Sequence, residues 1–418
     1  MSVFTEMEWR GEIHQVTSPD LAEKINQGGL TLYVGYDPTG ASLHIGHLAT
    51  LITLVRLQLA GHRVIPLIGD GTAPIGDPSG KSAERNLQSI EAIDQNALSI
   101  KSQIAAIFKA AGVSNFKFEH NAKWLRSILL FEFLRDTGKH FSVNAMMQKD
   151  SVKQRLEREG VGISFTEFSY ALLQARDFLE LYQREGCVLQ LGGSDQMGNI
   201  VGGVDLIRRI AGVQAFGATS PLILDSNGQK FGKTEKGAVF LDRKMTSVFA
   251  FYQFWINVSD ADCLMLLKRF TLLPRAEIAA LEPEIGQPTR LVQKTLARSI
   301  TTMVHGAADC ERVIADSEIL FYGKVAEISA ATRAELLESD TGIPTLIMDR
   351  SESRSVVDML VEMGLCESKG DARRQIAQKA IRINDEVVVE GQVFGLAETD
   401  HSIARVSRGK KNFGLILG

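Results

Sequence analysis

The stretch "LTLYVGYDPTGASLHIGHLATLITLVRLQLAGHRVIPLIGDG", residues 30–71, holds two apolar runs on either side of a helical pattern. The run 30–37 predicts a buried strand, and the run 63–71 predicts a second one. Between them, apolar residues recur at helical spacing over 46–62, and Gly61 marks the end of this helix. A strand–helix–strand unit of this length implies parallel strands with the helix packed against their sheet.

The same alternation continues through the first half of the chain. Residues 89–112 have a helical pattern, and the apolar runs 187–196 and 219–228 predict two further strands that run into glycine-containing turns. We therefore expect residues 1–228 to form a Rossmann-like α/β domain around a parallel sheet. Ligands of such sheets bind beyond the carboxyl ends of the strands, so the turns that follow the strands are the expected site.

The pattern changes after residue 228. A loop rich in glycine and lysine opens the segment 229–325, which has helical spacing from about residue 247 and predicts an all-helical domain. Residues 326–350 have a looser pattern and predict a linker. Residues 351–418 combine a helix with short strands, which predicts a small α+β domain.

Composition bounds the functions that the chain can have. Its 418 residues are 44% hydrophobic and 23% charged, which is typical of a soluble protein of two to four domains. The four cysteines lie far apart, so neither a disulfide framework nor a structural zinc site is expected. The N-terminal residues lack the apolar run of a secretory signal and no run is long enough to span a bilayer, so we expect a cytoplasmic protein. With a net charge of −4, any nucleic-acid binding must come from local basic patches.

His44 and His47 stand three residues apart where the predicted helix begins. A metal site is disfavoured because the other histidines form no second cluster in the sequence and no cysteine or acidic ligand stands beside the pair. Two interpretations remain: the histidines cap the helix, or they donate hydrogen bonds to a phosphate. The positive end of a helix dipole favours the second, and Gly46 leaves room for a nucleotide against the backbone.

The loop "GQKFGKTEKG", residues 228–237, places Lys230 and Lys233 on a glycine-flexed segment. Two ammonium groups on such a loop can neutralise the charge that grows on a polyphosphate in a transition state. Solvated surface lysines give the same pattern, so the loop alone does not separate the two interpretations.

Five ordered sequence blocks, taken together, favour the phosphate-binding interpretation of both motifs. They are "LYVGYDPTGASLHIGH", "IGDPSGKSAER", "FSYALLQARDF", "LGGSDQMGN" and "KFGKTEKGAVFLD". The HIGH tetrapeptide after the first predicted strand and the KFGKT loop after the last one resemble the signature motifs of class I aminoacyl-tRNA synthetases. KFGKT in place of the usual KMSKS is the form typical of bacterial tyrosyl-tRNA synthetases, and the resemblance covers essentially the whole chain.

The resemblance implies a catalytic domain over residues 1–228 and a reaction in two steps. The carboxylate of L-tyrosine attacks the α-phosphate of ATP, pyrophosphate leaves, and tyrosine then passes to the 3′ end of tRNA(Tyr). No enzyme nucleophile is needed, so catalysis is orientation together with stabilisation of phosphate charge. No permanently bound cofactor is expected, and Mg²⁺ is expected with ATP. The catalytic residues implied are Thr39, His44, His47, Lys81, Arg85, Lys230 and Lys233.

By the same resemblance, Asp195 accepts hydrogen bonds from the ribose of ATP. Leu222 and Ile223 form the floor of the adenine site, with ordinary core residues of a strand as the alternative. The full set implied for ATP is Gly35, Asp37, His44, Gly46, His47, Gly193, Asp195, Leu222, Ile223, Lys230, Lys233 and Thr234.

Recognition of tyrosine needs buried partners for its phenol. The resemblance assigns this role to Tyr33 and Asp177, and the chemistry agrees, since Asp177 can accept the phenolic proton while Tyr33 donates to the phenolic oxygen. Tyr170, Gln174 and Asp177 fall at i, i+4 and i+7 and share one helix face, although an amphipathic core helix with incidental polar groups is the alternative. The residues implied for the rest of the substrate are Asp77, Tyr170 and Gln174 for the ammonium and Gln196 for the carboxylate.

The C-terminal third is implied to bind tRNA. Residues 229–325 resemble an anticodon-stem domain, and residues 351–418 resemble an S4-type RNA-binding module. Ten basic and ten acidic residues cancel in the latter, so RNA binding there depends on clustering, with a solvated charged face as the alternative. The contacts implied are Arg373, Arg374, Arg408, Lys410 and Lys411. Relatives of this kind are homodimers, which leads us to expect a homodimer here.

Three rival functions remain to be weighed. A tryptophanyl-tRNA synthetase shares the scaffold, but an indole offers Tyr33 no acceptor. A non-catalytic RNA-binding derivative has no need of His44 and the two loop lysines. A small nucleotidyltransferase shares the HIGH element but does not need the RNA-binding third.

Overall fold

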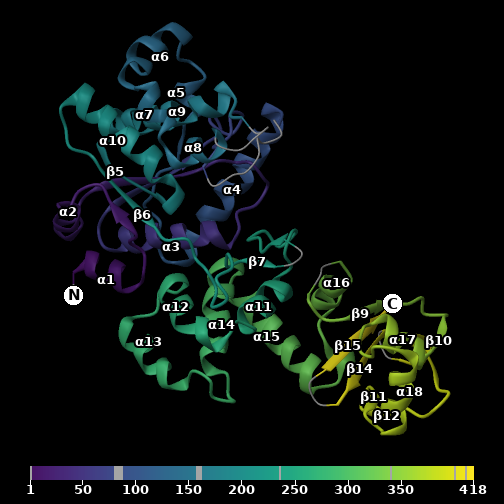
Figure 1. The fold of residues 1–418 in the computed structure, drawn as a ribbon. Helices are drawn as coiled ribbons and strands as arrows, with labels where there is room; N and C mark the ends of the chain where they lie inside the picture. The colour runs from purple at the N-terminus through teal and green to yellow at the C-terminus, as the bar shows by residue number, and fades with distance from the viewer. Residues whose placement is uncertain are drawn as a thin grey trace. The chain divides into compact units, whose positions relative to one another are not determined.

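The computed structural model describes residues 2–79, 88–156, 162–234, 237–338, 341–399, 402–409 and 412–418. The chain forms two compact units. The first comprises Met1–Asp242 with Val258–Val304, and the second comprises Arg243–Asn257 with His305–Gly418. The fold class predicted from the sequence is confirmed: a parallel-strand sheet, many helices and a C-terminal region rich in strands (Figure 1).

A six-stranded sheet forms the centre of the first unit, in the order β1-β6-β5-β2-β3-β4. The edge strand β1 is antiparallel, and the other five strands are parallel. After β2 the chain continues to β3 and β4 on one side and then returns to β5 on the other, so the crevice for a ligand is expected at the carboxyl ends of β2 and β5. The strands are β1 (Gln15–Val16), β2 (Thr31–Tyr36), β3 (Arg63–Ile68), β4 (Glu119–His120), β5 (Cys187–Gly193) and β6 (Phe216–Ser220).

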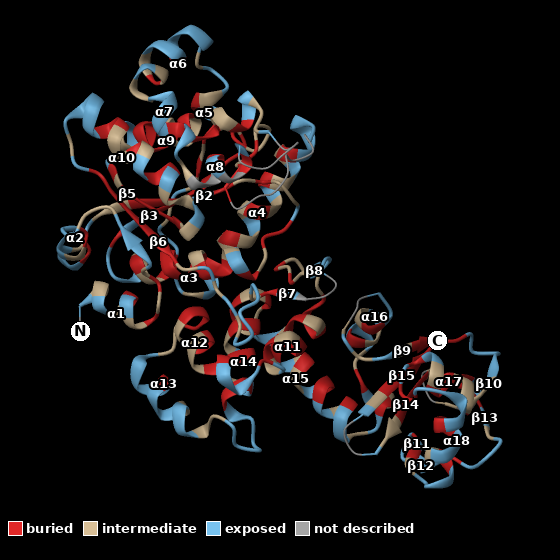
Figure 2. Ribbon diagram, in the orientation of Figure 1, coloured by how far each residue is buried: buried red, intermediate tan, exposed pale blue. Residues whose placement is uncertain are grey.

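Helices cover both faces of this sheet (Figure 1). On one face, α9 (Phe165–Glu185) brings Phe178 to 5.3 Å from Tyr33 of β2, measured between ring centroids. On the other face, α3 (Ile45–Leu59) brings Thr50 to the hydroxyl of Tyr36. Successive side chains of a strand alternate between faces, so Tyr33 and Tyr36 point in opposite directions. Figure 2 shows that the strands between these layers are largely buried.

The remaining helices of the first unit surround this centre. Arg10 and Arg56 both donate hydrogen bonds to the carbonyls of Lys268 and Thr271, which satisfies the C-terminal end of α12. The helices are α1 (Val3–Trp9), α2 (Leu21–Gln27), α4 (Ile90–Ala110), α5 (Ala122–Leu125), α6 (Leu130–Asp136), α7 (Val143–Met147), α8 (Asp150–Leu156), α10 (Met197–Ala211), α12 (Asp260–Phe270), α13 (Arg275–Leu281) and α14 (Leu291–His305), the last of which ends at the boundary of the unit. A short hairpin of β7 (Lys233–Thr234) and β8 (Gly237–Ala238) carries part of the KFGKT loop. None of the described helices combines the length and apolar character that a membrane span requires.

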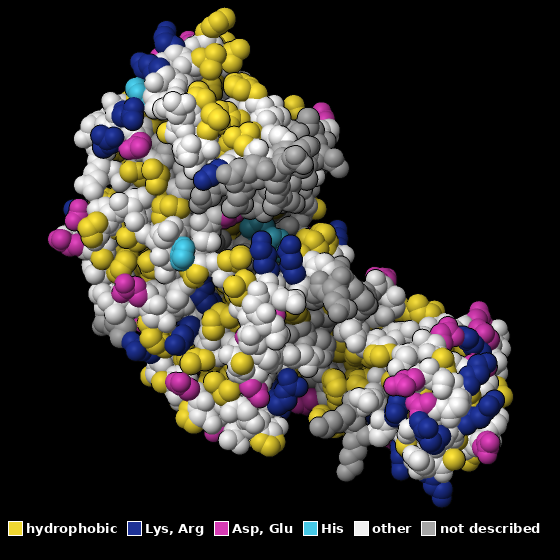
Figure 3. All heavy atoms as spheres, in the orientation of Figure 1, with side chains coloured by type: hydrophobic (Ala, Val, Ile, Leu, Met, Phe, Trp, Pro, Cys, Tyr) yellow, Lys and Arg dark blue, Asp and Glu magenta, His cyan; other side chains and the backbone are white. Residues whose placement is uncertain are grey.

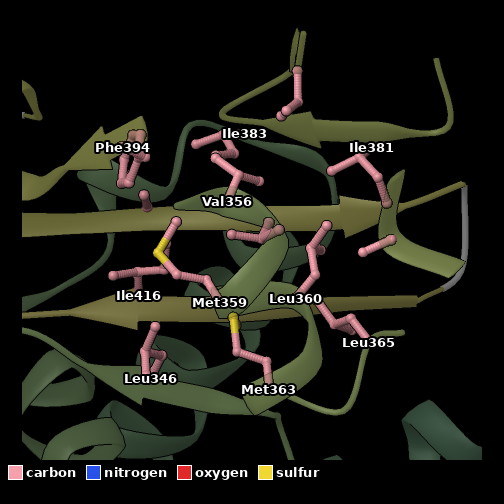
Figure 4. Packing of buried hydrophobic residues seen from close by; sticks show 14 of the residues in the cluster. Leu346, Val356, Met359, Leu360, Met363, Leu365, Ile381, Ile383, Phe394 and Ile416 are labelled. Atoms are coloured by element: carbon pink, nitrogen blue, oxygen red, sulfur yellow. The ribbon is translucent and has the colours of Figure 1, made fainter. Parts of the chain in front are cut away.

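The second unit has a core of its own. A five-stranded sheet in the order β12-β11-β14-β15-β9 packs against α17, and Figure 4 shows Met359, Leu360 and Met363 of that helix among buried strand residues. The helices are α11 (Val248–Ile256), α15 (Ala307–Tyr322), α16 (Ala330–Glu338), α17 (Val356–Glu362) and α18 (Lys369–Ala377). The strands are β9 (Thr345–Ile347), β10 (Ser353–Ser355), β11 (Ile381–Ile383), β12 (Glu386–Val387), β13 (Val393–Gly395), β14 (Ile403–Arg408) and β15 (Asn412–Leu417).

Two sequence expectations differ from the structure. The strand predicted over 219–228 lies earlier, because β6 ends at Ser220 and Pro221, which has no N–H to donate, follows it. The apolar residues after Pro221 lie on a partly exposed loop. The segment 326–350, expected to be a linker, carries α16 and β9, because Leu346 of β9 is buried in the C-terminal core while β9 pairs with β15.

Candidate active site

Open space lies over the middle of the central sheet, at the end of β2. Gly35 is exposed although β2 is an inner strand, and a side chain added there would meet no atom within 4 Å. The covering helices therefore leave the carboxyl end of β2 accessible. This is the crevice that the strand order predicts.

Two of the predicted tyrosine-binding residues are buried close to the same region of the sheet, Tyr33 on β2 and Asp177 on α9. Asp177 of α9 is 3% exposed, and its carboxylate accepts hydrogen bonds from Asn121 Nδ2 at 2.9 Å and from Trp124 Nε1 at 2.7 Å. Burial raises the pKa of Asp177 to about 8, even though these two hydrogen bonds act to lower it. Tyr33 is 1% exposed, and its hydroxyl has no hydrogen-bond partner in the described part of the chain. Burial, and then the charge of Asp177, raise the pKa of Tyr33 well above its ordinary value.

A second group of predicted residues forms one hydrogen-bonded network. Gln196 Nε2 donates to Asp77 Oδ2 at 2.7 Å, and Gln174 Nε2 donates to Gln196 Oε1 at 3.2 Å. Asn199 Nδ2 then donates to Gln174 Oε1 at 3.1 Å. The network presents a carboxylate and amide oxygens together, which is the chemistry that an ammonium group needs.

Tyr170 is connected to Asp37, which was assigned to ATP by the resemblance. The hydroxyl of Tyr170 donates to Asp37 Oδ2 at 2.7 Å, and Thr72 Oγ1 donates to Asp37 Oδ1 at 2.8 Å. Burial, followed by the charges of Asp37 and Asp77, raises the pKa of Tyr170 well above its ordinary value, so its proton stays in the bond to Asp37. The lone pairs of the hydroxyl oxygen then point elsewhere and can accept from an ammonium.

The two histidines cap α3. Gly46 N donates to His44 Nδ1 at 3.0 Å, and His44 N donates to His47 Nδ1 at 3.2 Å. The rings stack with centroids 3.9 Å apart. Gly46 is required here because a Cβ would lie 2.9 Å from the ring of His44. Since each Nδ1 accepts a backbone N–H, the proton of each neutral ring is assigned to Nε2.

The KFGKT loop lies beside this helix start. A β-bridge joins His44 to the chain just after the loop. Within the loop, Gly232 packs so close to Ile45 that a Cβ would lie 3.0 Å from that side chain. Lys230 and Lys233 are exposed on the loop. The structure thus brings together the two motifs that lie almost two hundred residues apart in the sequence.

Comparison with known proteins agrees with this geometry. Residues 25–321 match the family described as tRNA synthetases class I (W and Y), and residues 335–416 match the tyrosine–tRNA ligase SYY-like C-terminal domain. The chain is 45% identical over 426 aligned positions to the tyrosine–tRNA ligase of Geobacillus stearothermophilus, covering 100% of this chain and 99% of the relative. The chain belongs to the tyrosine–tRNA ligase family of class I tRNA synthetases.

Other members of the family match over the same extent. Tyrosine–tRNA ligase 2 of Enterococcus faecalis is 44% identical over 422 positions, covering 99% of this chain and 98% of the relative. A C-terminally truncated mitochondrial tyrosyl-tRNA synthetase of Aspergillus nidulans superposes with a TM-score of 0.70 at 31% identity, covering 77% of this chain and 94% of that one. The family resemblance found in the sequence is therefore confirmed.

Several of the residues that the family resemblance implies stand apart from these contacts. Lys81, Arg85, Lys410 and Lys411 lie outside the described residues, and the side chain of Thr234 is not described. Thr39 is half-buried on the turn after β2, where its carbonyl accepts a hydrogen bond from Gln88.

The residues predicted for the nucleoside end lie near β5 and β6. A Cβ on Gly193 would lie 2.8 Å from Asp195 Oδ1, so the close turn after β5 requires glycine. Leu222 is 51% exposed, which removes the core alternative for that residue, whereas Ile223 is half-buried.

Four residues that bond to the predicted site residues were not themselves predicted from the sequence. Asn121, Trp124, Asn199 and Thr72 all donate to predicted residues. Asn199 stands inside the quoted block "LGGSDQMGN", one helical turn after Gln196, and that spacing could have revealed it. Asn121 and Trp124 follow the two-residue strand β4, which has no apolar run to announce it.

The predicted tRNA contacts in the second unit are partly engaged by an acidic residue. Arg374 Nη2 lies 2.6 Å from Asp371 Oδ1, and Arg408 Nη1 lies 3.5 Å from Asp371 Oδ2. Arg408 also donates to the carbonyl of Leu365 at 2.8 Å. Arg373 is exposed on α18, in a part of the unit where Figure 3 shows basic and acidic side chains interleaved.

Proposed function

We propose that this chain activates L-tyrosine with ATP to give tyrosyl-adenylate and pyrophosphate, and then transfers tyrosine to the 3′ end of tRNA(Tyr). The family and its named relatives support the reaction. One observation supports tyrosine in particular: the buried hydroxyl of Tyr33 has no hydrogen-bond partner among the described residues, and Asp177 lies near enough to act on its pKa.

The phenol of the substrate completes this arrangement. The phenolic oxygen accepts a hydrogen bond from the Tyr33 hydroxyl, and the phenolic O–H donates a hydrogen bond to Asp177. The carboxyl oxygens of Asp177 have lone pairs beyond those that accept from Asn121 and Trp124. Phenylalanine offers the Tyr33 hydroxyl no acceptor and gives Asp177 no phenolic O–H to accept from in a desolvated site, the means by which tyrosyl-tRNA synthetases reject it. An indole offers Tyr33 no acceptor, which disfavours the tryptophan alternative.

The other end of the amino acid binds the polar network. Asp77, Tyr170 and Gln174 hold the ammonium, and Gln196 orients the carboxylate for attack on the α-phosphorus of ATP. A carboxylate oxygen forms the new bond to phosphorus as the bond from phosphorus to the pyrophosphate oxygen breaks. The chain supplies orientation, and no covalent bond to the protein forms.

The pyrophosphate side is assigned to the two motifs. The Nε2–H group of His44 is a donor to phosphate in the tautomer that the helix cap imposes, and His47, in the same tautomer, would lie against the nucleoside. Lys230 and Lys233 are long, exposed and on the adjacent loop, so they can reach phosphate charge as it develops. Thr39 completes this group, to which the resemblance adds Lys81 and Arg85.

Mg²⁺ is proposed to arrive with ATP. Across the described ranges, no group of three or more His, Cys, Asp or Glu side chains could hold a metal ion. In the proposed complex the ligands of Mg²⁺ would be phosphate oxygens of ATP. No step above depends on the ion.

We propose a cytoplasmic homodimer that binds tRNA through its C-terminal third. The apolar face on α6, α7 and the start of α9 supports the dimer, and Figure 3 shows hydrophobic side chains gathered at the top of the view, where α6 lies. Phe131 of α6 is 84% exposed. Beneath this face, Phe133, Met146 and Leu172 pack the three helices together. An exposed apolar surface of this kind is typical of a protein interface. Its exposed members are Leu129, Leu130, Phe131, Leu134, Val143, Met147 and Phe165.

ATP–pyrophosphate exchange with each amino acid in turn tests the first step. At equal concentration we expect rapid exchange with tyrosine and none with tryptophan, whereas exchange with phenylalanine should be far slower and measurable only at much higher phenylalanine concentration. Charging of tRNA(Tyr) tests the second step. Absence of exchange with every amino acid would favour the non-catalytic RNA-binding alternative.

A further inference from the structure

Asp70 belongs to none of the groups described above, although it lies close to them. It follows β3, is 8% exposed, and uses both carboxylate oxygens. Oδ2 lies 2.8 Å from His120 Nδ1, and Oδ1 accepts from Ala122 N at 3.1 Å. His120 and Ala122 are the residues on either side of Asn121. Asp70 therefore holds the chain immediately before and immediately after the residue that binds Asp177.

Asn121 has its amide orientation fixed from several directions. Its Oδ1 accepts from Gly71 N at 2.6 Å, so its Nδ2 must face the other way. That Nδ2 donates to Thr72 Oγ1 at 2.8 Å and to Asp177 Oδ2 at 2.9 Å. Gly71 is required because a Cβ there would lie 3.0 Å from Asn121 Oδ1 and from the backbone nitrogen of Ala122.

Trp124 depends on the same turn. Its backbone nitrogen donates to the carbonyl of Asn121 at 3.2 Å, and its indole Nε1 donates to Asp177 Oδ1 at 2.7 Å. Both donors to Asp177 thus come from the short segment that Asp70 holds. Arg126 donates to the backbone carbonyl of Asp70 at 3.2 Å, which ties the far end of the segment to the same residue.

We propose that Asp70, together with His120, is a positioning residue for tyrosine specificity, because it holds Asn121 and Trp124 where they aim the Asp177 carboxyl at the substrate phenol. The inference deepens the proposed function and rests on it. Asp70 touches no substrate; it acts through the turn between β4 and α5. Its effect falls on the phenol and not on the phosphates, because its bonds lead to Asp177.

The charge of Asp70 is suited to this role. Burial acts to raise its pKa, but hydrogen bonds from His120 and Ala122, together with electrostatic attraction from His120 and Arg126, outweigh burial, and the pKa of Asp70 lies below its ordinary value. An ionised carboxylate accepts hydrogen bonds about twice as strongly as a neutral acceptor. The pair therefore restrains the turn more firmly than a neutral amide could.

The test compares tyrosine with phenylalanine in ATP–pyrophosphate exchange by the full-length protein. For Asp70→Asn we expect kcat/KM for tyrosine to fall about tenfold, mainly through KM, because the lost bonds are charge-assisted. The kcat/KM for phenylalanine, which has no hydroxyl to donate to Asp177, should stay within about twofold of the wild-type value. His120→Asn loses one of the two bonds and should lower the tyrosine value about threefold.

Glu119→Gln is the matched control. Glu119 immediately precedes His120, is buried, and pairs outward with Lys117 and Lys123. Loss of the Glu119 charge weakens the ion pairs of the same strand but leaves the hydrogen bonds around Asn121 in place. The ratio of kcat/KM for tyrosine to kcat/KM for phenylalanine should therefore not change.

The outcomes separate the inference from the function. Suppose that the wild-type protein exchanges with tyrosine. If Asp70→Asn then keeps the wild-type ratio of kcat/KM for tyrosine to kcat/KM for phenylalanine, the positioning role is overturned and the proposed function stands. The same holds if Glu119→Gln lowers this ratio as much as Asp70→Asn does. If the wild-type protein shows no exchange with tyrosine, the proposed function fails, and the inference fails with it. If Asp70→Asn does not fold, His120→Asn decides, since it keeps the bond from Asp70 to Ala122; an unchanged ratio there overturns the role.

Discussion

Replacing Tyr33 with phenylalanine should stabilise the free protein and weaken its binding of tyrosine. In the part of the chain that the structure describes, the wild-type hydroxyl is buried without a hydrogen-bond partner, and leaving such a group unsatisfied costs roughly 1–3 kcal/mol. Removing it recovers part of this cost, less the packing of one oxygen atom. We expect a net gain of about 1 kcal/mol, which for a unit of this size raises Tm by about 2–4 °C.

Tyrosine affinity should change in the opposite direction. In the proposed complex the Tyr33 hydroxyl donates to the phenolic oxygen, and a neutral hydrogen bond contributes about 0.5–1.5 kcal/mol. The Kd for tyrosine should therefore rise roughly 2- to 12-fold. Phenylalanine has no oxygen to accept from Tyr33, so its weak binding should not weaken further.

Tyr36→Phe is the matched control, because Tyr36 lies on the same strand and is also buried. Its hydroxyl has a partner, Thr50 Oγ1 at 3.2 Å, on the face of the sheet away from Tyr33. Its loss should destabilise the protein by about 1 kcal/mol and leave the Kd for tyrosine unchanged. Thermal unfolding and calorimetric titration measure both quantities. If Tyr33→Phe destabilises the protein as Tyr36→Phe does, with unchanged tyrosine affinity, the phenol-binding argument is refuted.

Four further predictions follow from the site and the surface. The pKa of Asp177 is raised from 3.8 to about 8, so on raising the pH the unfolded state loses this proton before the folded state does. The free energy of unfolding of the wild-type protein should therefore fall between about pH 4 and pH 8, by up to ~1.4 kcal/mol per pH unit. Denaturant unfolding of Asp177→Asn across that range should show no such dependence on pH. His44→Asn keeps a helix cap but loses the ring Nε2–H, so adenylate formation should slow about 10²- to 10³-fold in rapid-mixing assays while tyrosine affinity is kept. Arg373→Ala should weaken tRNA binding and reduce its salt slope by about one, with tyrosine-dependent exchange unchanged. Phe131→Glu should give monomers in sedimentation experiments, because a charge on the apolar face opposes its burial.

The parallel sheet could be predicted because its inner strands are buried on both faces. Residues 30–37 and 63–71 are nearly continuous apolar runs, and both contain strands of the sheet. The strand before Pro221 was placed too late because Phe216–Ser220 consists mainly of small and polar residues, whereas the more apolar residues after it are partly exposed. Burial in a sheet depends on neighbours, and small residues between two packed strands give no local signal.

The site residues that share one element were predictable, and those that meet across elements were not. Tyr170, Gln174 and Asp177 lie on one helix, so their spacing alone brings them together. Asp70 and His120 lie 50 positions apart, and Asn121 and Asp177 lie 56 apart. Only the pairing of β3 with β4 and the return of α9 over the sheet bring these groups into contact.

The histidine pair shows how a structural role can set a chemical one. Helix capping and phosphate contact stood as rival interpretations of the sequence, and the structure establishes the cap: each Nδ1 accepts a backbone N–H. That bond leaves the proton of the neutral ring on Nε2, and a proton there is what a donor to phosphate requires. The cap also places both rings at the positive end of α3, where phosphate charge is favoured. In the proposed reaction the two roles are therefore not alternatives, because the first prepares the tautomer and the position that the second uses.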